Sequence, residues 1–91
     1  MQKILTITIP SYNVEAYIAA TLDTMVTINN LDLLEILVVN DGSKDNTVTV
    51  AQQYVDKHPN SVRIIDKENG GHGSTINAGI REATGKYFKV V

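Results

Sequence analysis

The strongest constraint on the fold comes from residues 34–40, which read Leu-Glu-Ile-Leu-Val-Val-Asn and are almost continuously apolar. This pattern is typical of a strand in the middle of a parallel sheet, where helices cover both faces. Residues 3–9, Lys-Ile-Leu-Thr-Ile-Thr-Ile, are rich in β-branched side chains and predict a second strand. Pro10 is expected to end that strand, because proline has no N–H to donate to a sheet. These two segments favour a layered fold built on a sheet.

Helical and extended segments alternate along the rest of the chain. Apolar spacing predicts helices at residues 14–28, 47–57 and 75–84, and further strands at 62–66 and 86–91. Asn13 is expected to cap the first helix, and Gly85 to supply a left-handed residue just past the third. Such alternation with short connections predicts one α/β domain over residues 1–91, with three layers (α/β/α) and a mainly parallel sheet.

Composition excludes several classes of protein. Hydrophobic residues make up 43% of the 91, which is too many for a disordered chain. The net charge is -2, so we expect no nucleic-acid partner, which would require a basic surface. The chain has no cysteine, which excludes disulfides and thiolate metal sites. Without a long apolar run or a visible signal peptide, we expect a cytoplasmic protein, and a membrane-associated parent remains open.

The predicted last strand, residues 86–91, reaches Val91 while its sequence is still apolar. A complete protein seldom stops inside a core strand, because an open sheet edge is left behind. We therefore expect a truncated domain, and we expect two copies to pair at the edge formed by residues 86–91 as a homodimer.

Polar or glycine-rich loops follow three of the predicted strands, at residues 10–13, 40–43 and 69–74. Ligands of open α/β sheets bind at the carboxyl ends of strands, where these loops meet. Together they offer an aromatic face, a carboxylate and backbone N–H groups, which suit a base, its ring N–H and a phosphate. Taken singly, each loop could be only a turn. Lys67 and Glu68, beside the third loop, are interpreted as a solvated pair.

Four motifs occur in a fixed order, at residues 3–13, 34–47, 68–71 (Glu-Asn-Gly-Gly) and 76–87. Their order and spacing resemble the N-terminal part of glycosyltransferase family 2, which has the GT-A fold, a Rossmann-like arrangement. The resemblance covers residues 3–91 and implies a sheet of strand order 3-2-1-4. It implies a bacterial type of enzyme that transfers a sugar from a nucleoside-diphosphate donor, UDP-linked, to a glycan, lipid or other acceptor.

The resemblance also assigns nucleotide-binding residues. Tyr12, with Pro10 and Asn13, matches the loop whose aromatic ring packs on the base, and Asp41 matches the carboxylate that accepts the base N–H. The remaining candidates are Glu15, near this pocket, and three residues of the loop and helix on the nucleotide-sugar side, Gly70, Gly71 and Asn77. The chain departs from the family at Asn40, where an acidic residue is usual, and at Ile76, where an arginine is frequent.

The family's Asp-x-Asp motif, which binds Mg²⁺ or Mn²⁺ on the diphosphate, is expected just beyond Val91, and the catalytic base, usually a carboxylate, further on. We therefore expect no catalytic or metal-binding residue in this fragment, which should be inactive alone. Two other interpretations stay open. A dinucleotide-binding Rossmann unit would have a glycine fingerprint after the first strand, where Pro-Ser-Tyr-Asn stands instead. A non-enzymatic α/β interaction module would use the same loops merely as turns.

Overall fold

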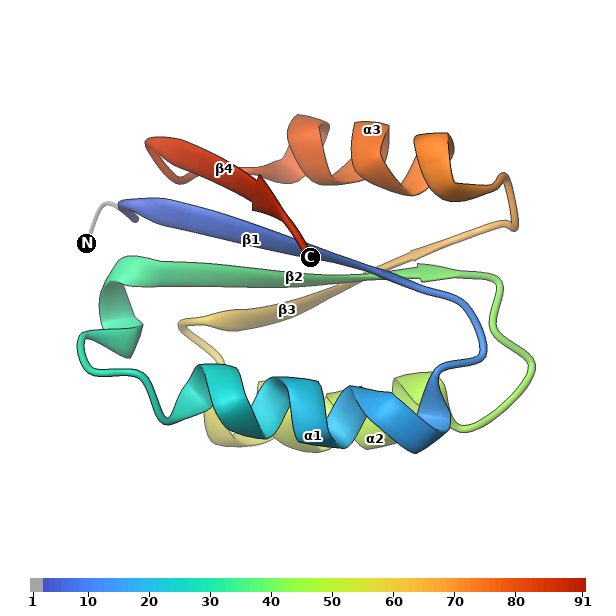
Figure 1. Ribbon diagram of the computed structural model, residues 1–91, viewed down its shortest axis with the longest axis horizontal. Coiled ribbons are helices and arrows are strands. Elements are labelled where there is room, and N and C mark those ends of the chain that lie inside the picture. The colour runs from blue at the N-terminus through green and yellow to red at the C-terminus, as the bar shows by residue number, and fades with distance from the viewer. Residues whose placement is uncertain (1–2) are drawn as a thin grey trace.

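The computed structural model describes residues 3–91, apart from the side chain of His72, and has the predicted α/β architecture (Figure 1). The elements in chain order are β1 Leu5–Ser11, α1 Glu15–Val26, the 3-10 helix η1 Leu31–Leu33, β2 Leu34–Asp41, α2 Thr47–Lys57, β3 Val62–Lys67, α3 His72–Glu82 and β4 Tyr87–Val90. The four strands are parallel and lie in the order β3-β2-β1-β4, which confirms the predicted sheet order.

Helices cover both faces of the sheet, α1 and α2 on one and α3 on the other (Figure 1). The larger core lies under α1 and α2 and consists of Ile7, Ile9, Ile18, Leu22, Ile36, Val38, Ala51 and Val62. The smaller core, under α3, consists of Leu37, Val39 and Ala78. Strand β2 contributes to both cores on alternate residues, which explains its continuous apolar sequence. Within residues 3–91 no helix is long and apolar enough to cross a bilayer.

Pro10 does not end β1, so that prediction is wrong: the strand continues to Ser11. The N–H of Val91 donates to the carbonyl of Thr8 (3.0 Å), so Thr8 faces β4. Backbone groups two residues apart in a strand face the same side, so Pro10, the next-to-last residue of β1, also faces the side of β4. Its missing N–H therefore interrupts the ladder only near the carboxyl end of β1.

Three predicted helix boundaries differ from the structure by two residues or more. Helix α1 ends at Val26, two residues early, and Asn13 (φ 52°) does not cap it. Helix α3 begins at His72, where a loop was expected, because the first turn of a helix tolerates glycine and its N–H groups need no partner within the helix. It ends at Glu82, before the predicted 84.

Gly85 does not have the left-handed backbone expected of it, since among the described glycines the positive φ angles belong to Gly42 and Gly71. It is required for a different reason. A Cβ atom at Gly85 would lie 2.6 Å from both the backbone nitrogen and the hydroxyl of Thr6. The Gly85 N–H donates to that hydroxyl (2.8 Å). Glycine therefore permits the turn between α3 and β4 to lie directly on β1.

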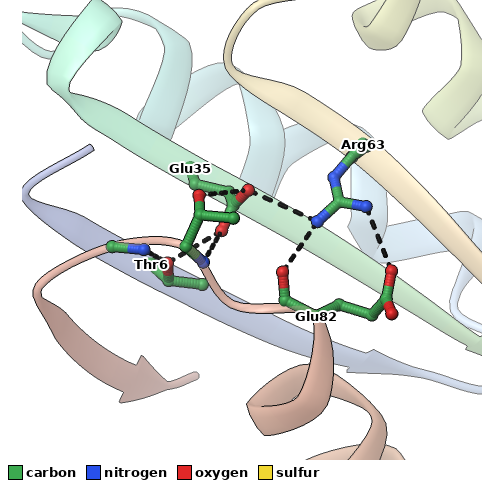
Figure 2. A network of polar contacts seen from close by, with 6 residues as sticks. Thr6, Glu35, Arg63 and Glu82 are labelled. Atoms are coloured by element: carbon green, nitrogen blue, oxygen red, sulfur yellow. Dashed lines mark hydrogen bonds and ion pairs between the residues drawn. The ribbon is translucent and has the colours of Figure 1, made fainter. Parts of the chain in front are cut away.

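A buried carboxylate, Glu35, fastens this turn to the sheet (Figure 2). It accepts hydrogen bonds from the Thr6 hydroxyl (2.9 Å) and from the backbone and side chain of Thr84 (2.8 and 2.9 Å), and it pairs with Arg63 (3.3 Å). Burial raises the pKa of Glu35, but the hydrogen bonds from Thr84 and Thr6 and the charge of Arg63 outweigh it and hold the pKa below its usual value. This network lies at the amino ends of the strands and leaves the carboxyl ends for the site.

Candidate functional site

The loops after β1, β2 and β3 enclose a cavity of about 390 Å³ at the carboxyl ends of the strands. Its lining, among the described residues, is Pro10, Ser11, Tyr12, Val14, Asp41, Asn69, Gly71 and Thr75. The convergence of these loops, expected from the parallel sheet, is thus present. Of the candidate residues from the sequence, the cavity brings together Pro10, Tyr12, Asp41 and Gly71.

Asp41, the last residue of β2, carries the buried carboxylate of the cavity and is 4% exposed. One oxygen, Oδ1, accepts hydrogen bonds from Lys67 Nζ (2.7 Å) and the Gly70 N–H (2.8 Å). The other, Oδ2, accepts one from the Gly71 N–H (3.0 Å). The hydrogen bond from Lys67, followed by that from Gly70, holds the pKa of Asp41 below its usual range despite burial. The carboxylate is therefore ionised at neutral pH.

Lys67 and Glu68 are not a solvated pair, so this interpretation is corrected. The Lys67 side chain is 18% exposed and pairs with Asp41, while its ammonium also donates to the backbone carbonyl of Glu68. The cause is strand register, because Asp41 and Lys67 are direct partners on the adjacent strands β2 and β3. Side chains opposite each other on neighbouring strands lie on the same face of the sheet.

Close packing of two loops explains glycines at the rim of the cavity. Gly42 has φ 74°, and a Cβ there would lie 3.0 Å from the backbone nitrogen of Asn69. At Gly70 a Cβ would lie 2.8 Å from the Ser74 hydroxyl and 3.1 Å from Lys67 Nζ. These positions let the third loop approach Asp41 closely enough for its backbone N–H groups to bind the carboxylate.

Tyr12 contributes the aromatic surface of the cavity. It directly follows β1 and is 45% exposed, so much of its surface is free to contact a ligand. An exposed ring beside a buried anionic acceptor is suited to a flat, polar heterocycle, which can stack on the ring and donate an N–H to the carboxylate.

Asn13 and Glu15 do not line the cavity, and their side chains bind the loop after β2. The Lys44 N–H donates to Asn13 Oδ1 (2.8 Å), and the Asn46 N–H donates to Glu15 Oε1 (3.2 Å). In the reverse direction, backbone N–H groups at the start of α1 donate to side-chain oxygens of this loop and of the first residue of α2. The pairs are Asn13–Ser43 (3.0 Å), Val14–Thr47 (3.0 Å) and Glu15–Asp45 (3.1 Å). These reciprocal bonds fix the position of the segment that carries Tyr12.

Asn77 is exposed on α3 and is also absent from the cavity lining. Asn40, at the position of the family's first acidic residue, is buried; its amide donates to Asp66 (2.7 Å) and its carbonyl accepts the Ser43 N–H (3.2 Å). Four lining residues were not among the candidates: Ser11, Val14, Asn69 and Thr75. Asn69 belongs to the Glu-Asn-Gly-Gly motif and Ser11 to the first polar loop, so local patterns could have indicated both. Val14 and Thr75 carry no such signal and are identified by the fold.

A divalent cation has no evident place among the described side chains. Within residues 3–91, apart from the His72 side chain, no group of three or more His, Cys, Asp or Glu residues is arranged to hold a metal ion. The carboxylate of Asp41 is paired with Lys67, which disfavours a cation there. The described residues therefore do not fit the metal that the family resemblance implies.

Residues 6–91 match the family model described as Glycosyl transferase family 2. A protein of Rickettsia prowazekii described as an uncharacterised glycosyltransferase is 45% identical over 85 residues, which are 93% of this chain and 25% of the relative. A Bacillus subtilis protein with the same description, EpsJ, is 36% identical over 91 residues, which are 100% of this chain and 26% of the relative.

Solved structures show the same likeness. The mannosyltransferase PcManGT from Pyrobaculum calidifontis, in complex with GDP-Man and Mn²⁺, gives a TM-score of 0.82 at 26% identity and matches 92% of this chain and 25% of its own. S. aureus TarS in complex with UDP-GlcNAc gives a TM-score of 0.82 at 28% identity and matches 97% of this chain and 26% of its own. The chain thus spans about a quarter of the length of these relatives.

Proposed function

Because this chain belongs to glycosyl transferase family 2, we propose that it is the nucleotide-binding part of an enzyme that transfers a sugar from a UDP-linked donor to a glycan, lipid or other acceptor. The single observation that carries the proposal is the cavity in which the exposed ring of Tyr12 and the ionised carboxylate of Asp41 both face one space. Two relatives with this fold bind nucleotide sugars, GDP-Man in PcManGT and UDP-GlcNAc in TarS.

The roles proposed for the individual residues come from the family resemblance, and the place of each residue is used here to support them. The ring of Tyr12, with Pro10, packs on the base, and Asp41 accepts the ring N–H. The diphosphate lies toward the start of α3, beside Gly70 and Gly71, where the helix dipole favours negative charge. The N–H groups of Gly70 and Gly71 themselves bind Asp41, so these two residues shape the site rather than donate to the phosphates. For Asp41 this role needs an ionised carboxylate with a lone pair left over, and its contacts meet that condition.

Asn13 and Glu15 serve the nucleotide indirectly in this proposal. Their hydrogen bonds with the loop after β2 hold Tyr12 in position, so their loss loosens the base site without removing a ligand contact. For Asn77, which is exposed on α3 and does not line the cavity, the family resemblance alone supports a place on the sugar side of the donor.

The 91-residue chain alone is inactive in sugar transfer under this proposal. Because the described residues hold no metal-binding group, the metal-dependent step belongs to residues outside them. We place the family's Asp-x-Asp motif, for Mg²⁺ or Mn²⁺, and the catalytic base beyond Val91. What remains here is recognition of the nucleotide.

Calorimetric titration of the chain with UDP and with NAD tests the proposal against its rivals. We expect UDP to bind more tightly than NAD, because the cavity offers one aromatic face and one acceptor for a base. Tighter binding of NAD would favour a dinucleotide-binding unit. Absence of binding by either, with the fold verified by circular dichroism, would favour an interaction module and contradict the nucleotide site.

We also propose that two copies pair along β4. This strand is hydrogen-bonded to β1 on one side, and its exposed residues include Tyr87 and Val90. An unpaired strand edge with exposed apolar side chains is a ready partner for a second copy.

A further inference from the structure

The carboxylate of Asp41 has fewer free acceptor sites than a solvated carboxylate. An ionised carboxylate offers about four lone-pair sites, two on each oxygen. Among the described residues, Lys67 Nζ and the Gly70 N–H bind Oδ1, and the Gly71 N–H binds Oδ2. The oxygen Oδ1 is therefore saturated, and Oδ2 retains one site for a ligand.

Bases differ in how many N–H groups they present to such an acceptor. Uracil and thymine present one ring N–H between two carbonyl oxygens. Guanine presents two N–H donors side by side, the ring N1–H and the exocyclic amino group, and pairs best with both oxygens of one carboxylate. A carboxylate with one oxygen available can accept the single ring N–H of uracil, but it leaves one of the two guanine N–H donors without a partner.

We propose, on the basis of the proposed nucleotide site, that Lys67 determines base specificity: by occupying Oδ1 of Asp41 together with Gly70, it restricts this carboxylate to one N–H and selects uracil or thymine over guanine. Lys67 is suited to this role because its short ion pair with Asp41 is largely shielded from water. Its position is set by the register of β2 and β3, so it stays beside Asp41 without needing the ligand.

Rejection of guanine follows from the cost of an unpaired polar group. To bind both guanine donors, Asp41 would have to give up its bond to Lys67 or to Gly70. Otherwise one donor is buried without a partner, which costs enough to weaken binding about tenfold. Because Lys67 is positively charged, it also attracts any nucleoside diphosphate, but that contribution is equal for all bases and cancels in a ratio of affinities.

Three nucleoside diphosphates separate these effects: UDP, GDP and inosine diphosphate. Hypoxanthine, the base of inosine, is guanine without the exocyclic amino group and presents a single N–H at the same edge. We expect the chain to bind inosine diphosphate about tenfold more tightly than GDP, and UDP more tightly than GDP, in calorimetric titrations. GDP binding as tightly as inosine diphosphate would overturn the proposal while leaving the nucleotide site in place.

A variant tests the residue itself. Lys67→Met keeps the length of the side chain but removes its donors and charge, which frees one site on Oδ1. We expect the preference for inosine diphosphate over GDP to fall to about twofold or less in this variant. The reason is that both guanine donors can then reach the carboxylate, so the roughly tenfold cost of an unpaired donor disappears. The matched control is Lys57→Met at the exposed end of α2, remote from the cavity, where the preference should be unchanged.

An unchanged preference in folded Lys67→Met would refute the role of Lys67. If this variant does not fold, the comparison of inosine diphosphate with GDP in the unaltered chain still decides whether Asp41 accepts one N–H or two. Failure of all three nucleotides to bind would contradict the proposed function itself, and with it this inference.

Discussion

Replacing Gly79 by alanine is expected to destabilise the fold, although alanine is the better helix former. Gly79 lies within α3, where the helix crosses β1. A Cβ atom there would lie 2.5 Å from the hydroxyl oxygen and 2.7 Å from the methyl carbon of Thr8, distances that require something to move. Thr8 is fully buried on a strand with neighbours on both sides, and its β-branched side chain has little rotamer freedom.

Two opposing terms set the magnitude. In a helix interior, alanine is favoured over glycine by about 1 kcal/mol. Overpacking a core costs about 1–3 kcal/mol, and the upper part of that range applies because the contact must lengthen by roughly 1 Å and neither partner is flexible. We therefore expect Gly79→Ala to lower the free energy of unfolding by about 1–2 kcal/mol.

Urea unfolding followed by circular dichroism measures this loss. Gly73→Ala is a matched control in the same helix, because a Cβ there meets no atom within 4 Å, and it should be neutral or slightly stabilising. Combining Gly79→Ala with Thr8→Ala should recover most of the loss. Thr8 Oγ1 has no hydrogen-bond partner among the described residues, so removing it breaks no bond. Equal stability of Gly79→Ala and the unaltered chain, or no recovery in the double variant, would refute the reasoning from close packing.

Three further outcomes are expected. Tyr12→Ala should weaken UDP binding by about 1–3 kcal/mol, which is the usual contribution of one base stacked on an aromatic ring. Tyr17→Ala, at a residue 72% exposed on α1, should leave UDP binding unchanged. Equal effects of the two substitutions in calorimetry would count against the base site. The pKa of Asp41 lies below its unfolded value, so the ionised carboxylate stabilises the fold above the unfolded pKa and this stabilisation is lost as the pH falls. Urea unfolding between about pH 6 and pH 3 should therefore show a steeper loss of stability for the unaltered chain than for Asp41→Asn. Parallel stability curves would contradict the ion pair. Sedimentation at rising protein concentration should show a dimer, and Val90→Lys on β4 should weaken it; a monomer throughout would exclude pairing at that edge.

The elements that positioned the site were largely predictable from local patterns. The apolar run of β2 reports burial on both faces, and each polar loop after a strand had to reach the same edge of a parallel sheet. The strand order and the family follow from the sequence motifs and are confirmed. Alternation of strands with helices therefore sufficed to locate the cavity.

Contacts between distant segments were less predictable. Lys67 was interpreted as solvated because its partner, Asp41, lies far away in sequence and becomes its neighbour only through the register of β2 and β3. The interlocking of Asn13 and Glu15 with the second loop likewise depends on how two loops fold against each other. Pro10 was misjudged because a proline near the carboxyl end of a strand removes one N–H from the ladder without ending the strand, and β1 continues to Ser11.

The most direct test of the nucleotide site is an amide NMR titration of the chain with UDP, which reports where the ligand binds. We expect the largest shifts at Tyr12, Gly70 and Gly71, whose amides lie at or beside the cavity, with little change near the separate hollow around residues 57–61 at the other end of the sheet. Shifts concentrated at residues 57–61, with none in the loops that hold Tyr12 and Asp41, would contradict the account.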